Sequence, residues 1–262
     1  MTMKALIFAG GYGTRISEES GVRPKPMVEI GGKPILWHVM KTYSHFGIDD
    51  FVIACGYKSN VIKDYFANYS LYSSDVTFDM RTNSSLFHKN GAEDWRVTLV
   101  ETGENASKSD RLLAVRKYLG NEAFLMTYGD GVSNVDVNKL IDFHKSQNVL
   151  VTVTAVQSPG RFGGFVLKGN QTKIKHFREK PKADGFDSAW INGGYFVIEP
   201  KALDFIKDPT QDWEEEPMRM LANAGQLAAF RHEGFWHPMD TLRDKNVLEA
   251  MWQTGIAPWK IW

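Results

Sequence analysis

The feature that most constrains this chain is an apolar strand that runs directly into a glycine-rich turn. Residues 6–8 (Leu-Ile-Phe) form a short apolar run suited to a buried central strand, and Gly10, Gly11 and Gly13 follow at once. Because glycine has no Cβ, the backbone of such a turn can approach an anion closely and point its N–H groups at phosphate oxygens. The strand is therefore expected to deliver a phosphate-binding loop.

Two cationic side chains follow the turn. Arg15 offers a planar fork for phosphate, and Lys25 is a point charge between Pro24 and Pro26, which keep the segment from becoming helix. A dinucleotide fingerprint would need a glycine at Ile16, and the P-loop pattern is absent. Taken alone, the glycines could simply make a tight turn. With the two cations beside them, they favour a nucleoside triphosphate site.

Composition excludes several other classes of protein. The 31 basic and 31 acidic residues cancel, so no global field attracts nucleic acid or an anionic membrane, and we expect neither as a partner. The single cysteine, Cys55, lies in an apolar run and is expected to be a buried structural thiol. We see no signal segment and no apolar run near the length of a membrane span, and we expect a cytoplasmic protein. The seven histidines show no zinc motif.

The order of β-rich and helical patterns predicts an α/β fold with a mostly parallel, Rossmann-like central sheet flanked by helices. In the first half we expect strands at residues 4–9, 51–54, 76–80, 97–101 and 123–127, with helices at 34–46, 59–68 and 109–119. In the second half we expect strands at 149–156, 165–167, 173–177 and 195–198, with helices at 215–223 and 242–253. No linker or internal repeat is evident, so residues 1–262 should form a single domain. Residues 81–94 read as a loop that is mobile or reaches a neighbouring subunit.

Several motifs together resemble one enzyme family. The turn at residues 10–15 (Gly-Gly-Tyr-Gly-Thr-Arg) and the segment 23–27 (Arg-Pro-Lys-Pro-Met) closely resemble the signature of the sugar-1-phosphate nucleotidylyltransferases. Further matches are residues 128–131 (Tyr-Gly-Asp-Gly), 177–181 (Phe-Arg-Glu-Lys-Pro), 191–194 (Ile-Asn-Gly-Gly) and 236–241 (Trp-His-Pro-Met-Asp-Thr). The resemblance implies the nucleotide-diphospho-sugar transferase type of fold. Residues 1–130 would then bind the nucleotide, and residues 131–262 would supply a smaller sugar-binding β elaboration and an assembly segment.

Within this family, the chain is similar to the branch that converts CTP and glucose 1-phosphate to CDP-glucose. The features that carry this similarity are residues 27–38, 159–163 and 257–260. Another nucleotide such as UTP or dTTP, another phosphorylated acceptor, and a non-catalytic nucleotide sensor remain alternatives. The resembled enzymes are oligomers, and the eight tryptophans exceed what one core needs. We therefore expect a homo-oligomer, a hexamer or another multimer.

The resemblance also implies roles for individual residues. Asp130 follows a predicted central strand, at the end where open α/β sheets bind ligands, and is expected to hold Mg²⁺ together with Asp240. Without the resemblance, Asp130 could be a turn residue and Asp240 a helix N-cap.

The expected catalytic residues are Arg15, Lys25 and Lys180. The expected nucleotide-binding residues are Phe8, Ala9, Gly10, Gly11, Gly13, Thr14, Arg15, Lys25, Thr102, Arg111 and Gly129. The expected sugar-binding residues are Tyr128, Glu179, Lys180, Asn192, Gly194 and Trp213.

The chain departs from the family pattern at one place near the expected base pocket. Where the family usually has Gly-Gly-Arg, this chain has Lys108-Ser109-Asp110-Arg111. The departure concerns the expected contacts to the base and not the expected catalytic residues.

Overall fold

Strand β1 (Ala5–Ala9) lies inside the main sheet, and all five of its residues are buried. It pairs in parallel with β4 (Asp50–Cys55) on one side and with β8 (Phe124–Tyr128) on the other, and β4 pairs in parallel with β7 (Arg96–Glu101). The computed structural model describes residues 3–16, 21–89, 91–157, 164–165, 172–173, 177–178 and 190–262. Within them, the expected parallel core of the sheet is confirmed, and with it the predicted α/β class.

The sheet continues through β13 (Trp190–Ile198), which is antiparallel to β8 and to β10 (Val151–Gln157). Strand β14 (Leu227–Arg231) pairs in parallel with β10, and the short β11 (Gly164–Phe165) pairs with β12 (Phe177–Arg178) and with β13. This antiparallel half is the expected β elaboration. Residues 166–171 and 174–176, which fall within or beside two of the predicted strands, lie outside the described residues.

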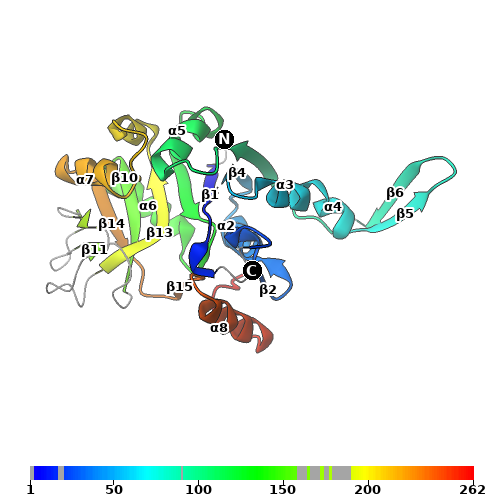
Figure 1. The fold of residues 1–262 in the computed structure, drawn as a ribbon. Coiled ribbons are helices and arrows are strands. Elements are labelled where there is room, and N and C mark those ends of the chain that lie inside the picture. Colours follow the sequence, from blue (N-terminus) through cyan, green and yellow to red (C-terminus); the bar gives the residue numbers. More distant parts are fainter. Residues whose placement is uncertain are drawn as a thin grey trace.

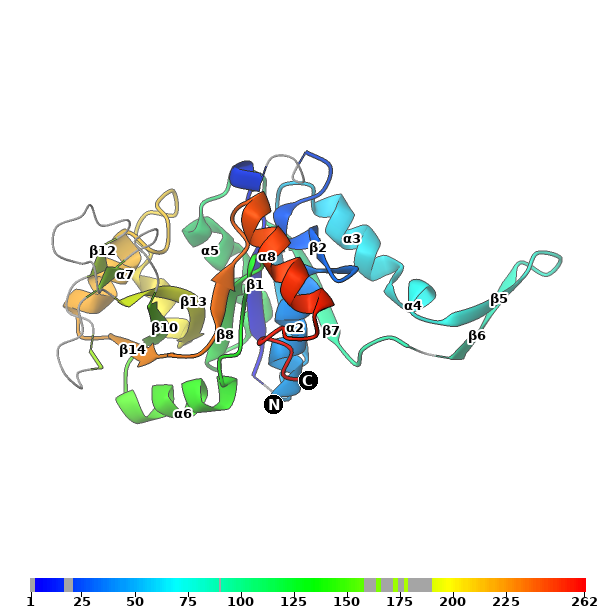
Figure 2. The ribbon, with the colours of Figure 1, turned by 90° about the horizontal axis from the view of Figure 1, so that it is seen from below.

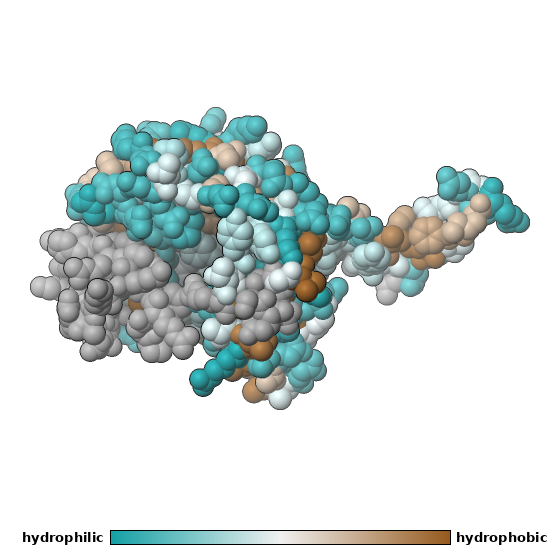
Figure 3. All heavy atoms as spheres, viewed as in Figure 1, coloured by the Kyte–Doolittle hydropathy of each residue, from teal (hydrophilic) through white to brown (hydrophobic). Residues whose placement is uncertain are grey.

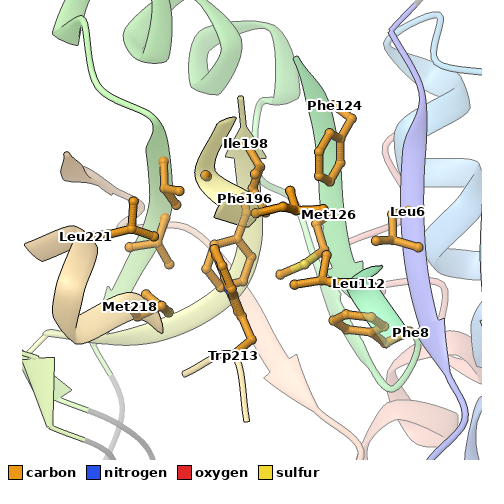
Figure 4. Close-up of a cluster of buried hydrophobic side chains, with 14 of the residues drawn as sticks. Leu6, Phe8, Leu112, Phe124, Met126, Phe196, Ile198, Trp213, Met218 and Leu221 are labelled. Atoms are coloured by element: carbon orange, nitrogen blue, oxygen red, sulfur yellow. The ribbon is translucent and has the colours of Figure 1, made fainter. Parts of the chain in front are cut away.

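Helices cover both faces of this sheet (Figure 1). The described helices are α2 (Ile35–His45), α3 (Ser59–Ala67), α4 (Tyr69–Tyr72), α5 (Lys108–Leu119), α6 (Val137–Gln147), α7 (Glu216–Asn223) and α8 (Leu242–Gln253), with short 3-10 turns η1 (Thr14–Ile16), η2 (Lys25–Met27) and η3 (Pro200–Phe205). Because side chains alternate along a strand, Leu6 and Phe8 of β1 pack towards α5 and α7, whereas Ala5 and Ile7 pack towards α2 and α6. Figure 4 shows the first of these two clusters, in which Trp213 lies beside Phe196.

A third buried cluster forms around the C-terminal segment. Trp259 is fully buried and packs with Ile30, Leu248 and Met239, which brings the end of the chain against the hairpin of β2 (Glu29–Ile30) and β3 (Lys33–Pro34). None of the eight tryptophans is exposed. Trp213 and Trp259 are buried and the other six are partly buried, so the oligomer expected from the tryptophan count stays a prediction.

The expected loop at residues 81–94 is largely an ordered hairpin. Strand β5 (Asp75–Asp79), predicted as part of the central sheet, instead pairs with β6 (Ser84–Lys89), and the turn between them includes Asn83 at a φ of 51°. The hairpin projects away from the rest of the molecule in both ribbon views (Figures 1 and 2). The β propensity was visible in the sequence, but the pairing partner was not.

Helix α6 was not predicted, although its ends carry recognisable signals. The N-cap Asp136 accepts a hydrogen bond from the backbone N–H of Lys139, and Asn148 ends the helix in the left-handed region. Strands β9 (Gly131–Ser133), β14 and β15 (Trp236–Pro238) were also missed, since short strands carry little periodicity. In the described part of the chain, no helix has the length and apolar character needed to cross a membrane.

Candidate active site

A buried ammonium group between two carboxylates lies at the centre of the site. Lys25 Nζ donates hydrogen bonds to Asp130 Oδ2 at 2.7 Å and to Asp240 Oδ1 at 2.6 Å. Lys25 is 7% exposed and Asp240 is 4% exposed. Burial lowers the pKa of Lys25, but the charges of the two carboxylates and their hydrogen bonds outweigh it, so the pKa lies above its ordinary value. The lysine is therefore held in its charged form.

A short antiparallel ribbon brings the two carboxylates together. Asp130 lies between β8 and β9, two residues after the end of β8, and β9 pairs with β15, whose last residue precedes Met239 and Asp240. The backbone N–H of Met239 donates to the carbonyl oxygen of Asp130 at 2.8 Å. The N-cap of α8 is Thr241, which forms a capping box with Asp244, so Asp240 is not the cap. Its side chain is directed to Lys25 instead.

The two carboxylates have the donor chemistry of a magnesium site. Both lie within hydrogen-bonding distance of one cationic nitrogen, so a single cation can contact both. Among the described residues, no group of three or more His, Cys, Asp or Glu side chains could hold a metal. Mg²⁺ usually takes one or two carboxylates and completes its shell with water and substrate phosphate oxygens. Asp130 and Asp240 match that pattern.

The glycine-rich turn is braced by Arg111, which is 4% exposed. Its guanidinium donates to the carbonyl oxygens of Gly10, Cys55 and Glu104 at 3.1, 3.2 and 3.1 Å, and to Thr102 Oγ1 at 2.5 Å. Burial lowers the pKa of Arg111 below its ordinary value. Arg111 thus connects the glycine-rich turn to the end of β4 and to the loop that follows β7. Cys55 is fully buried, as expected for a structural thiol, and burial raises its pKa to about 12.

A cavity of about 340 Å³ opens over this turn. Of the residues expected to bind the nucleotide, its lining includes Phe8, Ala9, Gly10, Gly11, Gly13, Thr14, Lys25 and Arg111. Thr102 lies beneath it, bonded to Arg111, and Gly129 packs against the backbone of Phe8, where an added Cβ would come within 3.0 Å of the carbonyl oxygen. The backbone of Arg15 belongs to η1, and its side chain lies outside the described part of the structure.

A second cavity, of about 190 Å³, lies next to the first and shares part of its lining. Tyr128, Asn192 and Gly194, all expected to bind the sugar, line it. Asn192 Oδ1 accepts a hydrogen bond from the N–H of Gly194 at 2.8 Å, and Gly194 has a φ of 79°, a conformation that glycine favours. Glu179 and Lys180 lie outside the described residues.

The structure places Trp213 away from both cavities. Its side chain is fully buried in the core cluster of Figure 4, so the expected contact with a sugar is not available to it. Its neighbour Glu214 lines the second cavity, and so does Lys108, which was not predicted as a site residue. Lys108, Tyr128 and Asp130 line both cavities and form the wall between them. Tyr128 and Asp130 were expected at the site from the sequence, whereas Lys108 was not.

Comparison with known proteins gives a consistent result. A family model described as nucleotidyl transferase matches residues 4–244. The glucose-1-phosphate cytidylyltransferase of Salmonella typhimurium is 55% identical over 99% of this chain and 100% of its own length. A probable glucose-1-phosphate cytidylyltransferase of Bacillus subtilis is 40% identical, with the same coverage. A crystal structure of UDP-glucose pyrophosphorylase complexed with UDP-glucose covers 97% of this chain and all of its own, with a TM-score of 0.76 and 18% identity, a likeness in fold alone.

Adjacent glycines of the turn should respond differently to substitution. A Cβ at Gly10 would lie 2.1 Å from Nη1 of Arg111, which is held by several acceptors, whereas a Cβ at Gly11 would meet nothing within 4 Å. We expect Gly10→Ala to lower the free energy of unfolding by about 1–3 kcal/mol and Gly11→Ala to change it by less than about 0.5 kcal/mol. Urea denaturation of both variants measures this difference. Equal stabilities would contradict the bracing role of Arg111.

Proposed function

The chain belongs to the nucleotidyl transferase family, and from this premise we propose that it transfers CMP from CTP to α-D-glucose 1-phosphate, giving CDP-glucose and pyrophosphate. The observation that carries the proposal is the meeting of Lys25, Asp130 and Asp240 at the junction of two cavities. The full-length relatives with the highest identities reported above bear the name of this activity. In this account the chain works as a single domain, with residues 1–130 mainly binding the nucleotide.

The chemistry we propose is a direct displacement at the α-phosphorus of CTP. A phosphate oxygen of the sugar phosphate forms the new P–O bond, the bond to the bridging oxygen of pyrophosphate breaks, and no covalent enzyme intermediate forms. The attacking oxygen is already anionic at neutral pH, so no strong base is required. Alignment and charge neutralisation supply the catalysis instead. Two cavities with a common wall suit such a reaction, because they hold both substrates at once.

We propose that Asp130 and Asp240 hold a Mg²⁺ ion, which would neutralise charge on the triphosphate. Lys25 would contact the α-phosphate, where charge is redistributed during the reaction. Arg15 would contact the departing phosphates, and Lys180 would hold the attacking phosphate. A non-catalytic sensor would not need a buried ammonium and two carboxylates held together. Choice of UTP or dTTP in place of CTP remains the main alternative within the family.

We also propose that the protein is a homo-oligomer and that the β5–β6 hairpin contributes to the contact between subunits. An isolated two-stranded hairpin is at best marginally stable in water. The hairpin nevertheless exposes Phe78 (55%), Met80 (87%), Leu86 (60%) and Phe87 (48%), and Figure 3 shows apolar residues gathered on its visible face. A second copy of the chain would cover this apolar surface. The cytoplasmic location expected from the sequence stays a prediction.

The proposed activity predicts a specific pattern of pyrophosphate release. Four nucleoside triphosphates, each paired with glucose 1-phosphate, mannose 1-phosphate and galactose 1-phosphate, form the panel. CTP with glucose 1-phosphate should give the highest kcat/KM, by about tenfold or more over UTP or dTTP, because an unpaired polar group facing the wrong base costs about 1–3 kcal/mol. A kcat/KM for UTP or dTTP equal to that for CTP would overturn the base assignment. If no pair of nucleotide and sugar phosphate released pyrophosphate, the assignment of this catalytic activity would be wrong.

The metal assignment predicts strong effects at Asp130 and Asp240. We expect Asp130→Asn and Asp240→Asn each to lower kcat/KM by about 100-fold or more and to weaken Mn²⁺ binding measured by electron paramagnetic resonance, since each removes a carboxylate ligand. Asp142→Asn, on the surface of α6, is the matched control and should leave both unchanged. Chelation with EDTA should abolish turnover. Undiminished turnover in EDTA would sink the assignment.

The assembly proposal is tested by light scattering. The native protein should have a mass that is a multiple of the 29.7 kDa chain, whereas Phe78→Ser combined with Met80→Ser should shift it towards a single chain. Val22→Ser removes an apolar side chain that is 72% exposed but lies outside the hairpin, and it should not change the mass. A native mass near 30 kDa at micromolar concentration would contradict the oligomer. An unchanged mass in the double variant would contradict the role of the hairpin.

A further inference from the structure

Lys108 occupies a position that a lysine ordinarily avoids. It is the first residue of α5, directly after the N-cap Ser107, and a positive charge at a helix N-terminus opposes the helix dipole. Two carboxylates offset this, because Lys108 Nζ lies 2.9 Å from Glu214 Oε2 and 3.4 Å from Asp212 Oδ2. Asp212 Oδ1 also accepts from the backbone N–H of Lys108 at 3.0 Å. A locally unfavourable residue that is held by specific partners is a candidate for a functional role.

Glu214 is the more buried member of this group. It is 5% exposed, its Oε2 accepts from Lys108 and its Oε1 accepts from the hydroxyl of Tyr128. A buried carboxylate is costly unless it is paired, and the ammonium of Lys108 supplies the partner charge. Burial lowers the pKa of Lys108, but the charges of Glu214 and Asp212 outweigh this, and the pKa lies above its ordinary value. The ammonium and the carboxylate form a stable ion pair.

This ion pair fixes the side chain that separates the two cavities. The ring of Tyr128 stacks on Phe8 with centroids 6.0 Å apart, and Lys108 Nζ lies 5.9 Å from its centroid. A Cβ at Gly194 would come within 2.7 Å of the ring, so the ring of Tyr128 packs directly against the backbone of Gly194. Its hydroxyl donates to Glu214, so these contacts together hold the ring between the two cavities. Of the two cavities described above, Glu214 lines the second and not the first.

We propose that Glu214 accepts a hydrogen bond from a ring hydroxyl of the sugar 1-phosphate, and that Lys108 is the positioning residue that orients it. This inference rests on the proposed function and extends it to the choice of sugar. A carboxylate offers about four lone-pair directions, and Tyr128 and Lys108 use two of them. The remaining directions are suited to hydroxyl donors, which a sugar carries in abundance.

The experiment measures kcat/KM for glucose 1-phosphate and for its 2-, 3-, 4- and 6-deoxy analogues. The variants are Lys108→Met, Lys108→Arg and Glu214→Gln, and the matched control is Lys117→Met, an exposed lysine on the same helix. In the native enzyme, at least one analogue should react about tenfold or more slowly than glucose 1-phosphate, because the analogue lacks the hydroxyl that donates to Glu214. In Lys108→Met and Glu214→Gln this ratio should fall to about twofold, whereas Lys108→Arg and Lys117→Met should retain it. KM for CTP should stay within about twofold in Glu214→Gln and Lys117→Met.

Three results would overturn the inference. One is a uniform loss of kcat/KM for glucose 1-phosphate and all four analogues in Lys108→Met, which is the signature of a purely structural residue. The second is a native discrimination ratio in Glu214→Gln, which decides the matter even where Lys108→Met does not fold. The third is an effect of Glu214→Gln that is confined to KM for CTP. A native enzyme that releases no pyrophosphate from CTP and glucose 1-phosphate would instead contradict the proposed function itself.

Discussion

The ammonium of Lys25 and the carboxylates of Asp130 and Asp240 form the contact on which the rest of the structure depends. The lysine is separated from its two partners by 105 and 215 residues in the sequence. A buried charge that loses one partner is strongly destabilised, so the η2 turn, the end of β8 and the start of α8 have to meet at one point. The β9–β15 ribbon satisfies this requirement, because it pairs the residues that flank the two aspartates.

A close approach of backbone segments completes the site. The carbonyl oxygens of Gly10 and Gly103 lie so near Gly56 that a Cβ there would come within 2.8 Å of each, and Arg111 binds the carbonyl of Gly10 in the same place. This packing sets the floor of the first cavity, while Tyr128 and Lys108 set its boundary with the second. Fold and chemistry are connected here: the parallel strands deliver the turn and Asp130 to one edge of the sheet, where substrates bound in the two cavities would meet.

The sequence predicted the features that have local signals. The buried strands β1, β4 and β8, the helices α2 and α5, and the placement of Asp130 beyond β8 all follow from apolar runs and turn residues. Contacts between distant segments had no such signal. Lys108 and Glu214 are 106 residues apart, and nothing in the spacing of either indicates the ion pair. The resemblance implied a sugar contact for Trp213, but its large apolar ring is buried in the core. The pairing of β5 with β6 depended on tertiary geometry in the same way.

The central claim is that the two substrates react directly with each other. Each substrate would bind in one of the two cavities, which share Lys108, Tyr128 and Asp130 in their linings. The stereochemical course at the α-phosphorus tests this claim most directly. The substrates are glucose 1-phosphate and a single diastereomer of the α-thio analogue of CTP. The configuration of the product is determined by ³¹P nuclear magnetic resonance. A single in-line displacement predicts inversion of configuration at that phosphorus. Retention of configuration would require two displacements through a covalent enzyme intermediate and would contradict the account.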